Sequence, residues 1–194
     1  MTRGTDVTAR AEEALTAYLA EAAIPWELGG RAGEYVVTLP GERKLRVVAS
    51  LLVRDPMTSV SAFVVRNPDE NHLACYRFLL RRNLRLPMLG YAVDSSGDVY
   101  VTGDVPTRAI DADYLDRLMG AVLTAADEPF NELLALGFLE SMKREWAWRV
   151  ERGESLANLE AFRSLLEGAE LTHGAAAEPQ GGDGADVEGV PPQE

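Results

Sequence analysis

The fold is decided by residues 67–106, which read NPDENHLACYRFLLRRNLRLPMLGYAVDSSGDVYVTGDVP. Apolar residues recur in the first half of this stretch at the spacing of a helix, which we expect to run from about Asp69 or Glu70 to Leu84. Pro87 then ends the helix, because proline has no N–H for the helical ladder. One helical stripe is expected to face the core: Leu73, Tyr76, Leu80 and Leu84.

The second half of the stretch predicts a two-stranded hairpin. Residues 88–93 and 98–105 read as strands, and residues 94–97 favour a turn in which Gly97 suits a positive φ. A calcium loop is not expected there, because the twelfth-position ligand and the flanking helices of an EF-hand are missing. A helix followed by an antiparallel hairpin indicates an α+β fold.

The residues before this stretch predict one helix and a series of strands. The helix runs from about Val7 to Ala23 and is ended by Pro25. Extended structure begins at Trp26, and longer strands are predicted at 34–39, 44–54 and 57–66. The last two strands carry apolar residues on both faces. We therefore expect helices on one face of the sheet, and the C-terminal helices or a second subunit on the other.

The residues after the stretch predict helices and then a tail. Asp111 caps a helix through Ala126, and a second helix restarts after Asp127-Glu128-Pro129. The second helix has a long apolar face of Phe130, Leu133, Leu134, Phe138, Met142 and Trp146. A last helix, from Ser155 to Glu167, presents Leu156, Leu159, Phe162 and Leu166. From Gly168 onward the composition is that of a disordered tail.

The predicted organisation is an α+β domain at residues 7–126, a helical extension at 127–167 packed on the same domain, and a disordered acidic tail at 168–194. The order of elements is helix-β-β-β-helix-β-β-helix with a mainly antiparallel sheet, followed by the C-terminal helical extension. No internal repeat is evident in the sequence.

This order resembles the YbjN domain family over roughly Val7 to Ala126. The residues that carry the resemblance are 72–83 (HLACYRFLLRRN), 86–88 (LPM), and the hairpin with Asp94, Gly97 and 103–106 (GDVP). The family resembles the class I chaperones of type III secretion in fold, and such chaperones are typically homodimers. It is loosely described as regulators of sensory transduction or stress and has no agreed catalytic residues, so the resemblance implies a fold and no active site.

Composition restricts the class of protein and its partners. The 194 residues carry a net charge of −12, and six acids with no Lys or Arg between Gly168 and Glu194 account for −6 of it. Such a chain repels nucleic acid and anionic membranes at long range, so neither is an expected partner. No apolar run approaches the roughly 20 residues of a membrane span, and the N-terminus lacks an apolar targeting region. A single cysteine suits a reducing cytoplasm.

The predicted central helix carries the densest basic cluster. Arg77, Arg81 and Arg85 follow one another at i, i+4 and form an arginine ridge, with Arg82 beside it. Guanidinium groups on a rigid helix can bind a carboxylate-rich peptide or a phosphate through paired hydrogen bonds. The alternative is that they bond surface acids and favour the negative end of the helix dipole.

The other chemically active residues favour structural roles. His72 is expected at the surface, where Asp69 or Glu70 could pair with it, and Cys75 is expected to behave as a small apolar residue. No second histidine or thiol stands at metal-ligand spacing, so neither a metal nor a cofactor is predicted. Trp148 lies off the apolar stripe of its helix and is a candidate for an interface, with simple packing as the alternative.

These observations favour a non-enzymatic protein-binding adaptor or chaperone-like regulator that acts as a homodimer, with an unknown protein partner. The alternative is a sensor of a small ligand or phosphometabolite that uses the arginine ridge. An enzyme using carboxylates such as Glu70 and Asp104 is the third and least favoured hypothesis.

Overall fold

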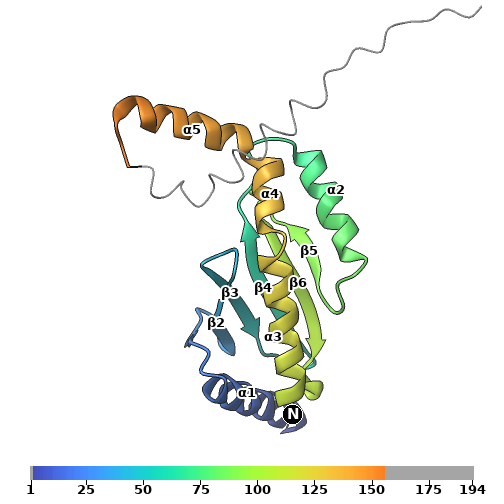
Figure 1. Ribbon diagram of the computed structural model, residues 1–194. Coiled ribbons are helices and arrows are strands. Elements are labelled where there is room, and N and C mark those ends of the chain that lie inside the picture. The colour runs from blue at the N-terminus through green and yellow to red at the C-terminus, as the bar shows by residue number, and fades with distance from the viewer. Residues whose placement is uncertain (1, 156–194) are drawn as a thin grey trace, which may run out of the picture.

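The computed structural model describes residues 2–155 and has the predicted α+β architecture (Figure 1). The elements are α1 (Thr2–Glu21), β1 (Trp26–Leu28), β2 (Glu34–Pro40), β3 (Arg46–Leu52), β4 (Met57–Val65), α2 (His72–Asn83), β5 (Gly90–Val93), β6 (Val99–Pro106), the short helix η1 (Thr107–Ala109), α3 (Ala112–Asp127), α4 (Phe130–Gly137) and α5 (Leu139–Arg152). The predicted order is therefore confirmed, with the short β1 added before β2. The first helix begins at Thr2 rather than near Val7.

The strands form one six-stranded sheet in the order β1-β2-β3-β4-β6-β5, and every neighbouring pair is antiparallel. The predicted hairpin is β5–β6, in which Gly97 has a φ of 86°. Because β6 pairs with both β4 and β5, the returning strand β5 lies at one edge of the sheet and β1 at the other.

The core lies between one face of the sheet and the helices α1, α3 and α4, which cover that face in Figure 1. Alternate strand residues point into it, as Val47, Ala49 and Leu51 do on β3. The helices meet these residues with fully buried leucines, among them Leu15, Leu115, Leu118 and Leu133.

The opposite face of the sheet is open among the described residues. On β3 and β4, Ser50, Ser59 and Ser61 point outward together with Val48, Met57 and Phe63, which are 41%, 38% and 39% exposed. Neither of the C-terminal helices within the described residues covers this face, because α4 packs on the inner face and α5 projects away from the sheet (Figure 1). Cover by a second subunit stays a prediction.

The helix α2 begins later than predicted and buries a different face. Asn71 has a left-handed backbone conformation (φ 51°), so the helix starts at His72 rather than at Asp69 or Glu70. Its fully buried residues are Cys75 and Leu79. The predicted core stripe was wrong: Leu73, Leu80 and Leu84 are 62%, 63% and 88% exposed, and Tyr76 is half-buried. The cause is that α2 packs at the edge of the sheet, against α4 and β5, along a narrow face.

The helix predicted after Pro129 is broken into α4 and α5 at Phe138, whose φ and ψ are −141° and 1°. The Gly137 carbonyl oxygen accepts bonds from the N–H groups of Asp69 and Glu70, at 2.9 and 3.2 Å, instead of from a helical N–H. This connection fixes the start of α2 to the end of α4. The predicted helix at 155–167 and the predicted tail lie outside the described residues.

Candidate functional site

A groove opens where β3 and β4 separate. These strands pair only between Ala49–Leu52 and Ser59–Ala62, and the ladder between β4 and β6 shifts register between Phe63 and Val65. Such a bulge bends its strand, so the end of β4 leaves β3. The groove has a volume of about 540 Å³, and its apolar walls are formed mainly by Val48, Phe63, Phe130, Leu134, Phe138 and Met142. We call it the Lys44 groove.

Lys44 lies at the end of the groove, where β3 and β4 separate. Its Nζ donates hydrogen bonds to the carbonyl oxygens of Phe63 and Val64, both at 2.8 Å. The same ammonium group lies 5.3 Å from the ring centroid of Phe63 and 5.5 Å from that of Phe130. Burial lowers the pKa of Lys44 to about 8, although the charge of Asp127 favours the protonated form. Lys44 therefore satisfies the β4 carbonyls that β3 leaves unpaired.

Asp127, at the end of α3, holds the loop that carries Lys44. Its carboxylate accepts hydrogen bonds from the backbone N–H groups of Glu42, Arg43 and Lys44, the shortest of them 2.8 Å. Desolvation favours the neutral acid, but these N–H bonds and the charge of Arg43 outweigh it and hold the pKa of Asp127 below its ordinary value. The buried carboxylate thereby fixes the position of Lys44 over the groove.

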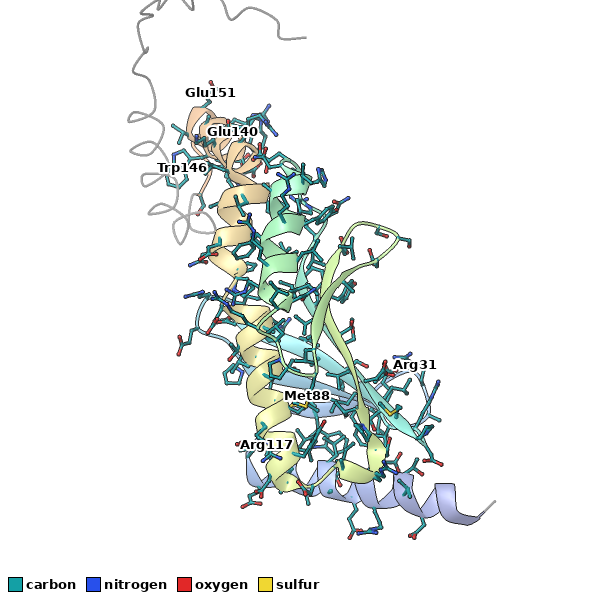
Figure 2. The ribbon with its side chains drawn as sticks, turned by 90° about the vertical axis from the view of Figure 1, so that its right-hand side faces the viewer. Arg31, Met88, Arg117, Glu140, Trp146 and Glu151 are labelled. Atoms are coloured by element: carbon teal, nitrogen blue, oxygen red, sulfur yellow. The ribbon has the colours of Figure 1, made fainter. Side chains whose placement is uncertain are left out.

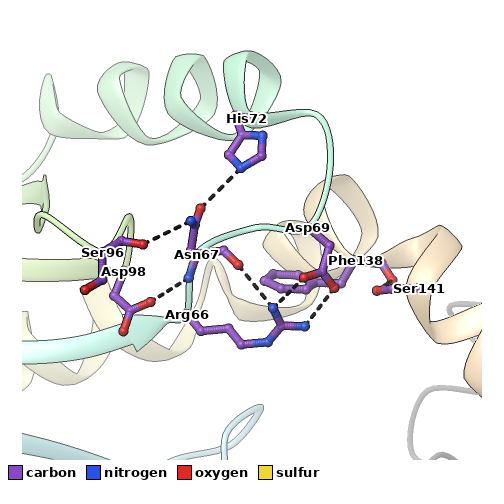
Figure 3. Close-up of polar contacts among 8 residues, drawn as sticks. All are labelled: Arg66, Asn67, Asp69, His72, Ser96, Asp98, Phe138 and Ser141. Atoms are coloured by element: carbon purple, nitrogen blue, oxygen red, sulfur yellow. Dashed lines mark hydrogen bonds and ion pairs between the residues drawn. The ribbon is translucent and has the colours of Figure 1, made fainter.

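A second polar cluster, shown in Figure 3, joins the rim of the groove to α2 and to the β5–β6 hairpin. The Arg66 guanidinium forms two bonds to Asp69, at 2.5 and 2.7 Å, and stacks over Phe138 at 4.5 Å from the ring centroid. The bond from Arg66 lowers the pKa of Asp69 to about 2. The neighbouring Asn67 donates its backbone N–H to Asp98 and its side-chain amide to Ser96. Through Arg66 and Asn67, the end of β4 is therefore bonded both to the segment before α2 and to the β5–β6 hairpin.

His72 takes part in this cluster through a contact with an amide side chain. Its Nε2 lies 3.2 Å from Oδ1 of Asn67 (Figure 3). The ring of His72 also lies near that of Tyr76, with the ring centroids 6.2 Å apart. The structure thus pairs His72 with an amide rather than with Asp69 or Glu70. Cys75 is fully buried, and this burial raises the pKa of its thiol, as an inert apolar role requires.

The outward face of α2 combines leucines with arginines. Leu73, Leu80 and Leu84 lie on it at helical spacing, and the exposed Arg77 and Arg81 stand between them. Within the described residues, no carboxylate forms an ion pair with Arg77, Arg81 or Arg85. We call Leu73, Arg77, Leu80, Arg81 and Leu84 the α2 face. The helix α2 contacts β5, the edge strand, whose outer side pairs with no other strand among the described residues.

In the structure, the arginines of the predicted ridge and the neighbouring Arg82 do not share one surface. Arg82 bonds Glu128 at 2.8 Å and Tyr91 Oη at 3.4 Å, with its guanidinium 5.7 Å from the Phe78 ring centroid, so it holds α2 against β5 and α3. A hollow of about 420 Å³ gathers Arg81, Arg82 and Arg85. Arg77 lies outside this hollow, on the α2 face.

The remaining candidates lie apart from these surfaces or already have partners. Trp148 is exposed on α5, and the Arg152 guanidinium covers its ring at 4.6 Å. A Glu70 oxygen accepts the backbone N–H of Glu140, whereas Asp104 accepts the hydroxyl of Ser59. In the described part of the chain, no group of three or more His, Cys, Asp or Glu side chains could hold a metal ion. No helix among residues 2–155 has the length and apolarity needed to cross a bilayer.

Sequence reasoning missed the Lys44 groove. Its walls come from β3, β4, α4 and α5. The spacing of apolar residues along a sequence does not indicate where two paired strands separate. One signal was available: Lys44 is one of only two lysines in a chain that otherwise uses arginine, and it stands directly before an apolar strand.

Known proteins share this sequence and arrangement. Residues 12–135 match the YbjN family model, described as "Putative bacterial sensory transduction regulator". The uncharacterized Mycobacterium tuberculosis protein Rv0487 is 51% identical over 137 residues, which cover 71% of this chain and 75% of that protein. The uncharacterized Mycobacterium leprae protein ML2442 is 49% identical over 132 residues, 68% and 72% of the two chains.

Among solved structures, the ExsC–ExsE complex aligns with 65% of this chain and 95% of the matched chain, at 16% identity and a TM-score of 0.49. The HopA1–SchA chaperone–effector complex aligns with 58% and 86%, at 14% identity and a TM-score of 0.43. The likeness is one of arrangement, and similarity at this level supports no conclusion about function. The family model matches residues 12–135, which is more than half of the chain and includes the helix–hairpin stretch at 67–106: the chain belongs to the YbjN family.

Proposed function

We propose that the chain is a non-enzymatic, protein-binding, chaperone-like adaptor that acts as a homodimer in the cytoplasm. The observation that carries the proposal is the α2 face, on which three leucines of one helix are exposed to more than 60% each. Full burial of a leucine side chain is worth about 1.5–3 kcal/mol, so leaving three adjacent ones in water is costly unless a partner covers them. The description of the family as regulators supports binding, rather than catalysis, as the output.

The composition of the α2 face suits a protein partner. Arginine is enriched in protein interfaces, where its long stem packs and its guanidinium bonds carboxylates, and Arg77 and Arg81 stand between the leucines. The adjoining edge strand β5 adds unpaired backbone groups that an extended segment can bind. A two-fold dimer would bury the same patch on both copies.

The homodimer is tested by changing the α2 face to acidic residues. We expect the double variant Leu80→Glu, Leu84→Glu to raise the dimer dissociation constant at least 100-fold, because each dimer would then bury four unpaired carboxylates. The measurement is mass by light scattering across a dilution series. The matched control is Leu28→Glu, Leu45→Glu, which changes two equally exposed leucines elsewhere and should leave the mass unchanged. A wild-type chain that is monomeric at 100 μM would overturn the dimer.

The adaptor role has its own test. The tagged wild type and the same two double variants are each purified from the native cells, and the proteins recovered with each are quantified. A partner should be recovered with the wild type and with Leu28→Glu, Leu45→Glu, and it should be lost with Leu80→Glu, Leu84→Glu. Equal recovery with all three chains would exclude the α2 face as the partner site.

A second function is favoured by the hollow lined by Arg81, Arg82 and Arg85, which has the charge and size for a small phosphorylated or carboxylated ligand. In that case an anion that raises the melting temperature of the wild type by several degrees should have no effect on the Arg81→Gln, Arg85→Gln variant. The control is Arg77→Gln, which leaves the hollow intact. If no anion in a metabolite panel shifts the wild-type transition, the sensor hypothesis fails.

A further inference from the structure

Lys44 presents a desolvated amine to an apolar cavity. Its Nζ lies 5.3 Å from the ring centroid of Phe63 and 5.5 Å from that of Phe130, and the side chain is half-buried. Among the residues that the structure describes, no carboxylate forms an ion pair with it. Burial disfavours the ammonium form and lowers the pKa of Lys44 to about 8. A lysine in such surroundings has the character of a nucleophile.

The hydrogen bonds of Lys44 do not require its charge. An ammonium group has three N–H donors, and two of them bond the carbonyl oxygens of Phe63 and Val64. Loss of the third proton keeps both bonds and leaves a lone pair that points away from these two carbonyls. The neutral amine can therefore hold the end of β4 and act as a nucleophile at the same time.

The charged groups around Lys44 leave a large neutral fraction of its amine. Arg46 and Arg66 line the same groove, and Asp127 holds the loop that carries Lys44. The charge of Asp127 favours the ammonium form, but desolvation outweighs it. Arg66 is bonded to Asp69, so it is not a free cation. With a pKa of about 8, about half of the Lys44 amine is neutral at pH 8, against less than about 1% for a lysine at the ordinary value of about 10.4.

The walls of the groove favour an electrophile with an aliphatic chain. The groove has a volume of about 540 Å³, and its lining is mostly apolar. Each methylene group that enters such a site strengthens binding about fourfold. A free carboxylate is disfavoured, because Lys44 and Arg66 already have partners. An acyl thioester carries both the chain and an activated carbonyl carbon.

The product also has to suit the place where β3 and β4 separate. Condensation of Lys44 with an aldehyde would give a neutral imine, which has no N–H for the carbonyls of Phe63 and Val64. Acylation gives an amide, whose single N–H can still bond one of them. The hydrogen-bonding needs of β4 therefore favour acylation over imine formation.

We propose that Lys44 is a site of acylation that takes a medium-length aliphatic acyl group from a thioester. The lone pair of Nζ attacks the thioester carbonyl carbon, so that an N–C bond forms and the C–S bond breaks. The nitrogen loses one proton and the departing sulfur gains one, which gives an amide and a free thiol. The acyl chain then lies among the apolar walls of the Lys44 groove, and the residue loses its charge. This inference concerns the groove alone and does not rest on the proposed function.

The chain contains its own control, because it has only two lysines. Lys143 bonds Glu140 at 3.1 Å and lies outside the groove on α5, which Figure 2 shows at the end of the molecule opposite Arg117. The full chain is incubated at pH 8 with the hexanoyl or the acetyl thioester of N-acetylcysteamine, and acylation of each lysine is quantified by peptide mass spectrometry. We expect the hexanoyl donor to acylate Lys44 at least tenfold faster than Lys143. The acetyl donor should show a smaller ratio, because its chain cannot fill the groove, and in the chain unfolded by urea the two lysines should react alike.

A carboxylate placed in the groove should suppress the reaction. Val48→Asp replaces a wall residue that is 41% exposed, so it leaves the core intact. We expect this variant to react at Lys44 at least fivefold more slowly with the hexanoyl donor, because the new charge favours the ammonium form and the wall becomes polar. The matched control is Val93→Asp, the same change at a residue that is 46% exposed on β5 and outside the groove, and it should react as the wild type does. Far-ultraviolet circular dichroism verifies that both variants are folded.

Three results would overturn the proposal. Acylation of Lys44 that is no faster than that of Lys143 in the folded chain would show that the amine is not activated. A ratio that is the same for the hexanoyl and acetyl donors would show that the acyl chain does not enter the groove. Equal rates at Lys44 in folded Val48→Asp and Val93→Asp would place the reaction outside the groove.

Discussion

Replacement of Asp127 by alanine is expected to lower the free energy of unfolding by about 3 kcal/mol, because it leaves a set of backbone N–H groups without a partner. In the folded chain, this carboxylate accepts bonds from Glu42, Arg43 and Lys44, and only about 7% of the residue is exposed. The loop that positions Lys44 is held by these bonds, and a Cβ at Gly41 would overlap both the Lys44 carbonyl oxygen and the Asp127 carboxylate. Urea unfolding of the two chains measures the difference.

The stability that Asp127 supplies should also depend on pH. Its folded-state pKa lies below the ordinary value of 3.8, so its contribution is fully present above that pH and is lost as the pH falls through the folded-state pKa. The unfolding free energies of the wild type and Asp127→Ala should therefore converge below pH 4. Asp116→Ala is the control on the same helix, since that carboxylate is exposed and has one long bond, 3.3 Å, to Tyr18. A loss of under 1 kcal/mol for Asp127→Ala at pH 7 would contradict the role given to this residue.

Two glycine-to-alanine replacements should change stability in opposite directions. A Cβ at Gly137 would lie 2.8 Å from the Pro68 Cβ and 3.1 Å from the Cys75 sulfur, so Gly137→Ala should cost about 2 kcal/mol through overpacking. Gly120 lies exposed within α3, with nothing within 4 Å of its added Cβ, so Gly120→Ala should stabilise the chain by about 0.5–1 kcal/mol. Thermal and urea unfolding measure both changes.

The Gly137 variant also reports on α2. Gly137 fixes the start of that helix through its carbonyl, so displacement of the contact should weaken folding and also the dimer proposed to form through the α2 face. Stabilisation by Gly137→Ala, or destabilisation by Gly120→Ala, would contradict the packing described at these two positions.

The strands were predictable because their patterns report local geometry. The residues around Val47 and Val60 alternate as strands must, and the turn at residues 94–97 has the glycine that its backbone requires. The same patterns do not report what covers each face of the sheet. The outer face combines Ser50, Ser59 and Ser61 with exposed apolar side chains such as Val48 and Phe63, and neither α4 nor α5 covers it.

The errors in the helices have a common physical origin. The helical spacing of apolar residues predicted a buried stripe on α2. The spacing of Leu73 and Leu80 is the same whether these side chains face the core or a partner. In the structure, Cys75 and Leu79 contact the core instead. Apolar spacing also continues from Phe130 through Trp146 without interruption, whereas the backbone breaks at Phe138 because Gly137 bonds a distant loop. Both outcomes depend on contacts between segments far apart in the chain.

The narrow attachment of α2 has a consequence for how this family diversifies. Two fully buried side chains, Cys75 and Leu79, anchor the helix, whereas the side chains of the α2 face on its opposite side are exposed. Substitutions at Leu73, Arg77, Leu80, Arg81 and Leu84 can therefore accumulate at little cost to folding. Under the proposed function, replacements on the α2 face would therefore change which partner the chain binds, while the stability of the fold, which depends on residues elsewhere in the chain, is kept.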